Sequence, residues 1–284
     1  MLRIDLAVSA GQSRVNEDAV GHYGDAAWVI DGATGIGENL LDGPSDAAWF
    51  AQTANRVLAQ VLAESPSLPT LAVLREVMAR CAETLAREQI RSADGPHEMP
   101  SAAFAMVRII DGEAEFTTLA DCRIAARDET GNARLYGASA IDEIEARTIA
   151  AMKAILRAEP EIAPDELKAR LMPGLQDNRA LMNREGGYWI LGVDPAAADH
   201  VWQARLPITA GQRFALASDG FLRLIELFNV TDAAGMLAIS NEQDWQDWLG
   251  RLRALEGEPD SLRRYARVKP HDDASLVVCQ WEND

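Results

Sequence analysis

The sequence predicts an α+β fold in which antiparallel β-sheets are covered on the outside by helices. Three observations predict this class. Strand-like segments open the chain, fill its middle and close it; two amphipathic helices separate the first two groups of strands; and short polar turns join several neighbouring strands. A doubly wound parallel sheet would instead alternate strands and helices regularly. No repeat or linker divides the 284 residues, so we expect one domain over 1–284.

The first part of the chain begins with three strand-like segments, Arg3–Val8, Ala19–Tyr23 and Ala26–Asp31. Gly24-Asp25 separates the second and third segments, as the turn of a hairpin does. A helix is expected after Pro44, with Ser45 as its N-cap, and runs to about residue 64. A second helix is expected over about 70–92, because apolar residues recur on one of its faces: Leu74, Val77, Met78, Cys81 and Leu85.

The middle of the chain returns to strands. Segments 101–110 and 113–120 are joined by Asp111-Gly112, a strong hairpin signal, and strands at 123–127 and 133–137 follow. A polar, alanine-rich stretch from about 142 to 172 is predicted to be helical with breaks at Pro160 and Pro164, so a helical insert is expected around 141–180. The other expected elements are strands at 186–191, 200–206, 213–218 and 274–281 and helices at 221–228, 244–255 and 261–268.

Composition excludes several classes of function. The net charge of −17 argues against nucleic-acid binding, which needs clustered Lys and Arg, and against docking on an anionic membrane. Cys81, Cys122 and Cys279 are scattered and form no CxxC pair, so we expect core residues and neither disulfides nor a zinc site. No leader-like or membrane-spanning apolar run is present, and a cytoplasmic location is predicted.

Four short acidic segments lie at the ends of strand-like runs: Asn16-Glu17-Asp18, Ile30-Asp31-Gly32, Ser218-Asp219-Gly220 and His271-Asp272-Asp273. Side chains at strand ends meet at one edge of a sheet. Carboxylate and carbonyl oxygens are the ligands that Mg²⁺ and Mn²⁺ prefer. Each segment alone is also typical of an ordinary turn. Taken together, they indicate a carboxylate cluster that binds divalent cations, because like charges in a small volume repel each other.

The chain resembles the metal-dependent type 2C serine/threonine protein phosphatases at five successive motifs. The motifs occur in the family's order and span nearly the whole chain. They are Glu17-Asp18-Ala19, Asp31-Gly32-Ala33-Thr34-Gly35, Leu119-Ala120-Asp121-Cys122-Arg123, Leu216-Ala217-Ser218-Asp219-Gly220-Phe221 and Asp272-Asp273-Ala274-Ser275.

The resemblance implies a four-layer α-β-β-α sandwich, in which two antiparallel sheets pack together with helices on both outer faces. It also implies a centre of two ions, Mn²⁺ or Mg²⁺, where activated water hydrolyses a phosphate monoester without a covalent intermediate. The candidate catalytic residues are Asp31, Asp219 and Asp272. The metal site would comprise these three together with Gly32, Glu17, Asp18 and Asp121, and Arg14 would bind the substrate phosphate.

Some positions depart from the family's pattern. Arg14 lies three residues before Glu17, where the family usually has four, and Ala33 stands where animal members have a histidine. Arg223 stands where a third ion would need a carboxylate, and Asp273 replaces the usual asparagine. The threonine-rich flap of the family is also not recognisable before residue 191.

Three functions stay open at this point. The first is a phosphatase acting on phosphoserine or phosphothreonine in a protein partner, and the second is an inactive relative that serves as a regulatory binding module. The third is an unrelated carboxylate-metal hydrolase that acts on a small phosphorylated molecule. The sequence leaves the substrate and the oligomeric state undecided.

Overall fold

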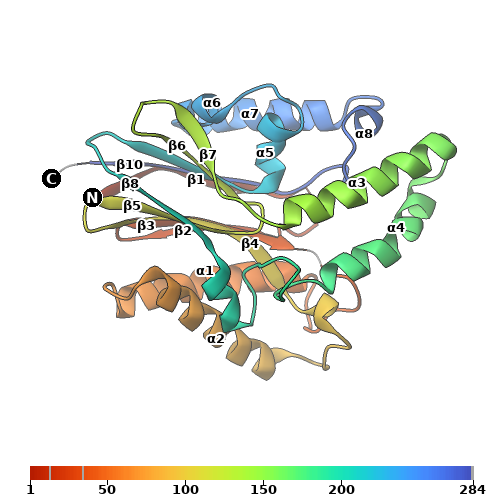
Figure 1. Ribbon diagram of the computed structural model, residues 1–284, viewed down its shortest axis with the longest axis horizontal. Helices are drawn as coiled ribbons and strands as arrows, with labels where there is room; N and C mark the ends of the chain where they lie inside the picture. The colour runs from red at the N-terminus through yellow and green to blue at the C-terminus, as the bar shows by residue number, and fades with distance from the viewer. Residues whose placement is uncertain (13, 34, 283–284) are drawn as a thin grey trace.

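Two antiparallel five-stranded sheets form the centre of the structure, a computed structural model that describes residues 1–12, 14–33 and 35–282 (Figure 1). The first sheet has the spatial order β1 (Leu2–Ala10), β10 (Ala274–Trp281), β9 (Arg213–Ala217), β6 (Arg123–Arg127) and β7 (Ala133–Tyr136). The second has the order β2 (Asp18–Tyr23), β3 (Ala26–Ala33), β4 (Ser101–Ile110), β5 (Glu113–Leu119) and β8 (Trp202–Pro207).

Successive apolar side chains of the central strands point to opposite faces of each sheet, which explains why the two sheets stack. In β3, Ala27 and Val29 belong to the core between the sheets, whereas Trp28 and Ile30 belong to the core under the helices. The other sheet follows the same rule, since Phe214 of β9 faces inward. Successive side chains of a strand point to opposite faces. A strand that is apolar throughout can therefore bury both of its faces, as these do.

Helices cover both outer faces of the stacked sheets. Helices α1 (Asp46–Glu64) and α2 (Thr70–Glu88) pack on the sheet that contains β3. Helices α5 (Asp219–Glu226), α6 (Ala233–Ala238) and α7 (Glu242–Glu256) cover the sheet that contains β9. Figure 1 shows these helices above and below the sheets. The predicted α+β class, with its four layers, is confirmed.

Several local predictions are also confirmed. The Ser45 hydroxyl caps α1 by accepting a hydrogen bond from the Ala48 N–H at 3.2 Å. Strands β4 and β5 pair across the turn at Asp111-Gly112. Helix α2 ends at Glu88, before the expected end at about residue 92. The three cysteines are buried, free thiols.

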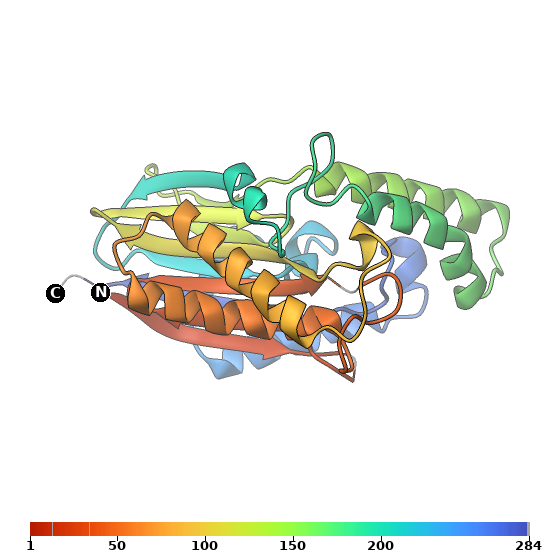
Figure 2. The ribbon, with the colours of Figure 1, turned by 90° about the horizontal axis from the view of Figure 1, so that it is seen from below.

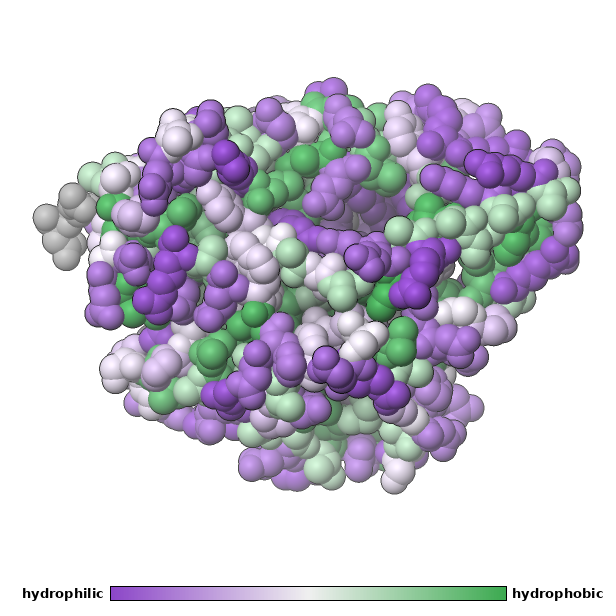
Figure 3. All heavy atoms as spheres, in the orientation of Figure 1, coloured by the Kyte–Doolittle hydropathy of each residue, from purple (hydrophilic) through white to green (hydrophobic). Residues whose placement is uncertain are grey.

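Helices α3 (Ile141–Ala158) and α4 (Pro164–Arg179) form a pair that projects from one end of the sandwich (Figures 1 and 2). The chain termini lie at the opposite end. The break between the helices falls at the predicted prolines, because a proline is tolerated in the first turn of a helix but not in its interior. Helix α4 nevertheless contains Pro173 and extends past the expected end at 172. Hydrophilic and hydrophobic residues are mixed on the surface of this pair (Figure 3).

Two sequence predictions are wrong, and one helix was missed. Segment 186–191 forms only isolated bridges, Ala102 with Leu191 and Met182 with Tyr188, because a tight turn with a hydrogen bond from Gly187 N–H to the Arg184 carbonyl interrupts it. The helix expected over 261–268 is the short α8 (Ser261–Arg264). Helix α6 was not predicted, and short 3₁₀ turns occur at η1 (Pro96–Glu98) and η2 (Pro195–His200).

Within residues 1–12, 14–33 and 35–282, none of the helices combines the length and the hydropathy of a bilayer-spanning segment.

Candidate active site

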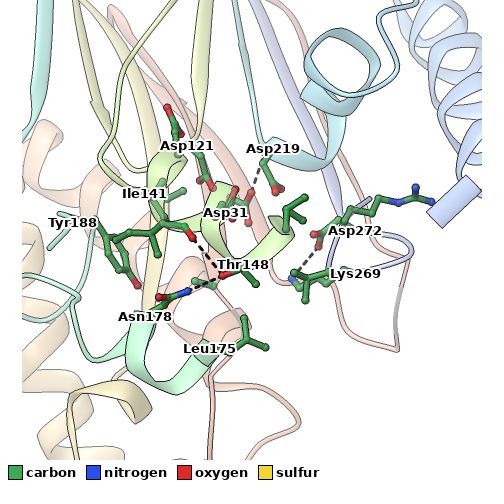
Figure 4. A pocket seen from close by; sticks show the side chains of 18 of the residues that line it. Asp31, Asp121, Ile141, Thr148, Leu175, Asn178, Tyr188, Asp219, Lys269 and Asp272 are labelled. Carbon is green, nitrogen blue, oxygen red and sulfur yellow. Dashed lines mark hydrogen bonds and ion pairs between the residues drawn. The ribbon is translucent and has the colours of Figure 1, made fainter. Parts of the chain in front are cut away.

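Strand ends bring distant aspartates to the end of the sandwich from which α3 and α4 project. Asp31 lies near the end of β3, and the β2–β3 register places Asp18 directly opposite it. Asp121 follows β5, Asp219 follows β9 as the first residue of α5, and Asp272 shortly precedes β10. Figure 4 shows Asp31, Asp121, Asp219 and Asp272 around one common space.

That space is a cavity of about 470 Å³, and five of the predicted site residues line it. They are Asp31, Gly32, Asp121, Asp219 and Asp272. Asp18 and Glu17 lie next to it rather than in its wall. Asp18 is 2% exposed and accepts a hydrogen bond from the Ser275 hydroxyl at 2.7 Å, and Glu17 accepts one from the Ser45 hydroxyl.

Arg14, the predicted phosphate ligand, is exposed and is not among the described residues that line the cavity. Thr34, which belongs to one of the five motifs, lies outside the described residues.

Close backbone contacts hold the acidic segments together. The Gly32 N–H donates to the Glu17 carbonyl at 3.1 Å, and a Cβ at Gly32 would lie 2.3 Å from the same oxygen. A Cβ at Gly220 would lie 1.9 Å from the Asp273 carbonyl oxygen. Both positions exclude any side chain. The glycines of the Asp-Gly motifs therefore allow β3 and α5 to approach the acidic loops.

Asp273 ties the loop before β2 to the start of β10. Its Oδ1 accepts from the Gln12 N–H at 2.8 Å, and its Oδ2 accepts from the Glu17 N–H at 2.7 Å. A carboxylate can accept both bonds at once, whereas an amide offers only one acceptor oxygen. Asp273 therefore positions the segment that carries Glu17 and Asp18.

Burial and mutual repulsion raise the pKa values of several carboxylates in the cluster. Burial, followed by the charges of Asp18 and Asp219, raises the pKa of Asp31 well above its usual range. Burial and the charge of Asp219 likewise raise the pKa of Asp121. Burial raises the pKa of Asp18 to about 7. A bound cation would relieve this repulsion.

The donors at this end of the sandwich suit a hard divalent cation, because they are carboxylate oxygens around a partly enclosed space with unmet negative charge. The Asp219 N–H donates to the Asp31 Oδ2 at 3.3 Å and so links two of the cavity aspartates directly. Among the described residues, no three His, Cys, Asp or Glu side chains stand in a metal-holding arrangement. The carboxylates would have to turn toward a common point to coordinate an ion.

Asp272 is held by two cations instead. Its Oδ1 lies 3.1 Å from the Lys269 Nζ, and its Oδ2 accepts from an Nη of Arg223 at 2.9 Å. These cations oppose the effects of burial and of Asp219, which raise the Asp272 pKa to about 6. The sequence drew attention to Arg223 but not to Lys269, because a lysine three residues before a motif carries no recognisable signal.

The helical insert contributes a wall that sequence reasoning did not assign to the site. Glu145 and Thr148 of α3, Asn178 and Arg179 of α4, and Tyr188 line the cavity. Asn178 donates to the Thr148 hydroxyl at 2.8 Å, which links the two helices (Figure 4). Partial loss of water, together with the charge of Asp219, raises the pKa of Glu145 to about 7.

Arg179 connects the insert to the strand that carries Asp31. It is 7% exposed, and one Nη donates to the carbonyl oxygens of Ala33 at 3.1 Å and Met99 at 3.3 Å. Among residues 1–12, 14–33 and 35–282, its buried Nε has no hydrogen-bond partner. No sequence pattern marked this residue, because its partners are backbone atoms far away in the chain.

Comparisons with known proteins agree with this geometry. The model of a family described as Protein phosphatase 2C matches residues 9–263. The serine/threonine phosphatase PstP/Ppp of Mycobacterium tuberculosis has a similar structure, with a TM-score of 0.60, 16% identity and 99% of each chain covered. A structure of the PstP catalytic domain in complex with two manganese ions matches with a TM-score of 0.54, 16% identity and 99% of each chain covered.

Another similar structure is PppA, described as a regulatory component of the type VI secretion system in Pseudomonas aeruginosa. It has a TM-score of 0.54 and 16% identity, with 99% of this chain and 98% of that chain covered. At these identities the structures show a shared fold. No curated protein matches the chain in sequence.

Proposed function

Because the chain belongs to the protein phosphatase 2C family, we propose that it hydrolyses phosphate monoesters, with phosphoserine or phosphothreonine on a protein as the substrate. One observation carries the proposal. Asp31, Asp121, Asp219 and Asp272, which are far apart in the sequence, line a single cavity at the end of the sheets. So many buried like charges are costly unless they serve to bind a cation.

The proposed roles are those that the family resemblance implies, for residues that line the cavity or lie beside it. Asp31, the Gly32 carbonyl, Asp219 and Asp272 would hold two ions, Mn²⁺ or Mg²⁺, and Asp121 would support them from the end of β5. Bound divalent ions activate water and neutralise the charge that develops on a transferred phosphoryl group. Glu17 and Asp18 would act mostly by holding metal-bound waters, and each accepts a hydrogen bond from a serine hydroxyl.

Arg14 is proposed to bind the substrate phosphate on the strength of the resemblance alone. A guanidinium offers paired donors to phosphate oxygens, so its loss would raise KM more than it lowers kcat. An unchanged KM in Arg14→Ala would remove Arg14 from the site. The cavity cations Arg179 and Lys269 would then be the residues to examine.

A regulatory binding module is the second candidate, and one observation favours it. Asp272 is paired with Lys269 and Arg223, so both of its oxygens already have positively charged partners. Such pairing would weaken metal binding and could leave a site that recognises phosphorylated partners without turnover. A cytoplasmic location and the choice between Mn²⁺ and Mg²⁺ stay predictions.

Phosphate release from an aryl phosphate tests the enzyme proposal. We expect release with Mn²⁺, none with chelator, and a loss of about 10²–10³-fold in kcat for Asp219→Asn, in line with the removal of one electrostatic group from an active site. Asp177→Asn, at an exposed position on α4, is the matched control and should retain full activity. No turnover by folded protein that binds Mn²⁺ would favour the regulatory module. Turnover of small esters but of no phosphopeptide would favour a small-molecule hydrolase.

A further inference from the structure

The Asp272 carboxylate differs from the other cavity aspartates in having two cationic partners of its own. Lys269 Nζ lies 3.1 Å from Oδ1, and Figure 4 shows this side chain directed at Asp272 within the cavity. Arg223 Nη lies 2.9 Å from Oδ2 and belongs to α5, one helical turn after Asp219. Both cations line the same cavity as Asp31 and Asp219.

The two cations are not equally free to move. Arg223 also donates to the Glu256 Oε1 at 2.6 Å, and the Glu256 side chain is fully buried. Glu256 receives Arg253 at 2.6 Å as well, so Arg223 sits in a buried ion network. Breaking such a network is strongly unfavourable, because it leaves a buried charge without a partner. Arg223 is therefore a fixed cation.

Lys269 is the exchangeable cation. Its side chain is 44% exposed, and Asp272 is the only carboxylate in the described residues with which it forms an ion pair. An ion pair with a half-exposed lysine contributes little to stability, so Lys269 can leave Asp272 at little cost. A divalent ion that approaches Asp272 meets this ammonium at the same carboxylate and is repelled by it.

We propose that Arg223 and Lys269 are positioning residues, whose positive charges hold the Asp272 carboxylate. Lys269 also competes with a divalent ion for Asp272 and so weakens metal binding. The inference rests on the proposed function, since it takes Asp272 as a metal ligand. Arg223 keeps the Asp272 carboxylate oriented both with and without a bound ion, because its ion pair with Glu256 stays intact. Lys269 sets the metal concentration at which the site fills.

Calorimetric titration of the chain with Mn²⁺, without substrate, tests the competition. Lys269→Met should bind Mn²⁺ roughly tenfold more tightly than the natural chain, within the about 5- to 150-fold span usual for coupled sites. Lys269→Arg retains the charge and should bind within about twofold of the natural chain. Lys168→Met, at an exposed position on α4, is the matched control and should not change the affinity.

The outcomes separate this inference from the proposed function. Equal Mn²⁺ affinity in the natural chain and in Lys269→Met would overturn the competition while leaving the phosphatase proposal intact. Absence of Mn²⁺ binding in both would overturn the metal assignment and the competition with it. Melting temperatures in chelator should agree within about 3 °C, because the lost pair involves the half-exposed Lys269 side chain. Weaker binding in Lys269→Met would also overturn the inference, since it would make Lys269 a support of the site.

Discussion

Gly32 lies so close to the backbone of Glu17 that the geometry of the site requires a glycine at this position. The contact sets the distance between the strand that carries Asp31 and the loop that carries Glu17 and Asp18. A methyl group would have to displace a backbone carbonyl from 2.3 Å, which no side-chain rotation can avoid. Displacements of about 1 Å in an active site can lower rates about 10²-fold.

Gly32→Ala is therefore expected to lower kcat/KM about 10²-fold and to destabilise the fold by about 1–3 kcal/mol. Steady-state kinetics and urea unfolding measure the two effects. Gly250→Ala is the control, because Gly250 is an exposed residue of α7 with no atom within 4 Å of an added Cβ. The control should stabilise the chain by about 0.5–1 kcal/mol. Normal activity in Gly32→Ala would show that the contact can open without harm.

At the scale of elements, one ion pair fixes the start of the insert. Arg123 of β6 binds both oxygens of Asp142 at 2.9 Å, and Arg123 also donates to the Ala120 carbonyl at 3.0 Å. Asp142 lies in the first turn of α3, next to the Ile141 that lines the cavity. This ion pair, in which one Nη of Arg123 contacts both carboxylate oxygens, holds α3 against the strand that follows Asp121.

Asp142→Ala should loosen α3 without unfolding the body of the protein. Amide hydrogen exchange along α3 is expected to quicken by up to about fivefold, because a half-exposed pair contributes about 0.2–1 kcal/mol. The rates of amide hydrogen exchange in β3 and β4 should equal those of the natural chain. Asp165→Ala removes the corresponding first-turn acid of α4 and is the matched control. Unchanged exchange in α3 would mean that other contacts fix the insert.

Elements that depend on neighbouring residues could be predicted from the sequence, whereas features that depend on contacts between distant segments could not. The hairpin at Asp111-Gly112 and the cap at Ser45 rest on neighbouring residues, and both were predicted correctly. Segment 186–191 has the composition of a strand, but it forms isolated bridges, one to β4 and one to Met182, because a tight turn at Gly187 interrupts it. In the site, the carboxylates at strand ends were predictable from motifs. Glu145, Arg179 and Lys269 were not, because only the folded insert and the loop before Asp272 bring them to the cavity.

On the scale of the whole molecule, the stacked sheets bring an excess of negative charge to one end of a chain whose net charge is already −17. Folding without metal forces buried carboxylates to stay protonated or to repel one another. Their raised pKa values mean that the folded chain binds more protons than the unfolded chain in the range between the two pKa values. Stability must then fall as the pH rises through that range.

Asp18 gives this pH dependence a test, since its pKa is raised from 3.8 to about 7 by burial and it is 2% exposed. In chelator, its contribution to stability is fully present below about pH 4 and is lost as the pH rises to about 7, at up to about 1.4 kcal/mol per pH unit. Asp18→Asn keeps an acceptor for Ser275 but cannot titrate, so its melting temperature should fall less between pH 5 and pH 8.

Asp177→Asn is the control and should show the pH slope of the natural chain, because it changes the net charge equally at an exposed site. Saturating Mn²⁺ should raise the melting temperature most at pH 8, where the carboxylates are ionised. Equal slopes in Asp18→Asn and Asp177→Asn would assign the pH dependence to the overall charge rather than to the buried cluster.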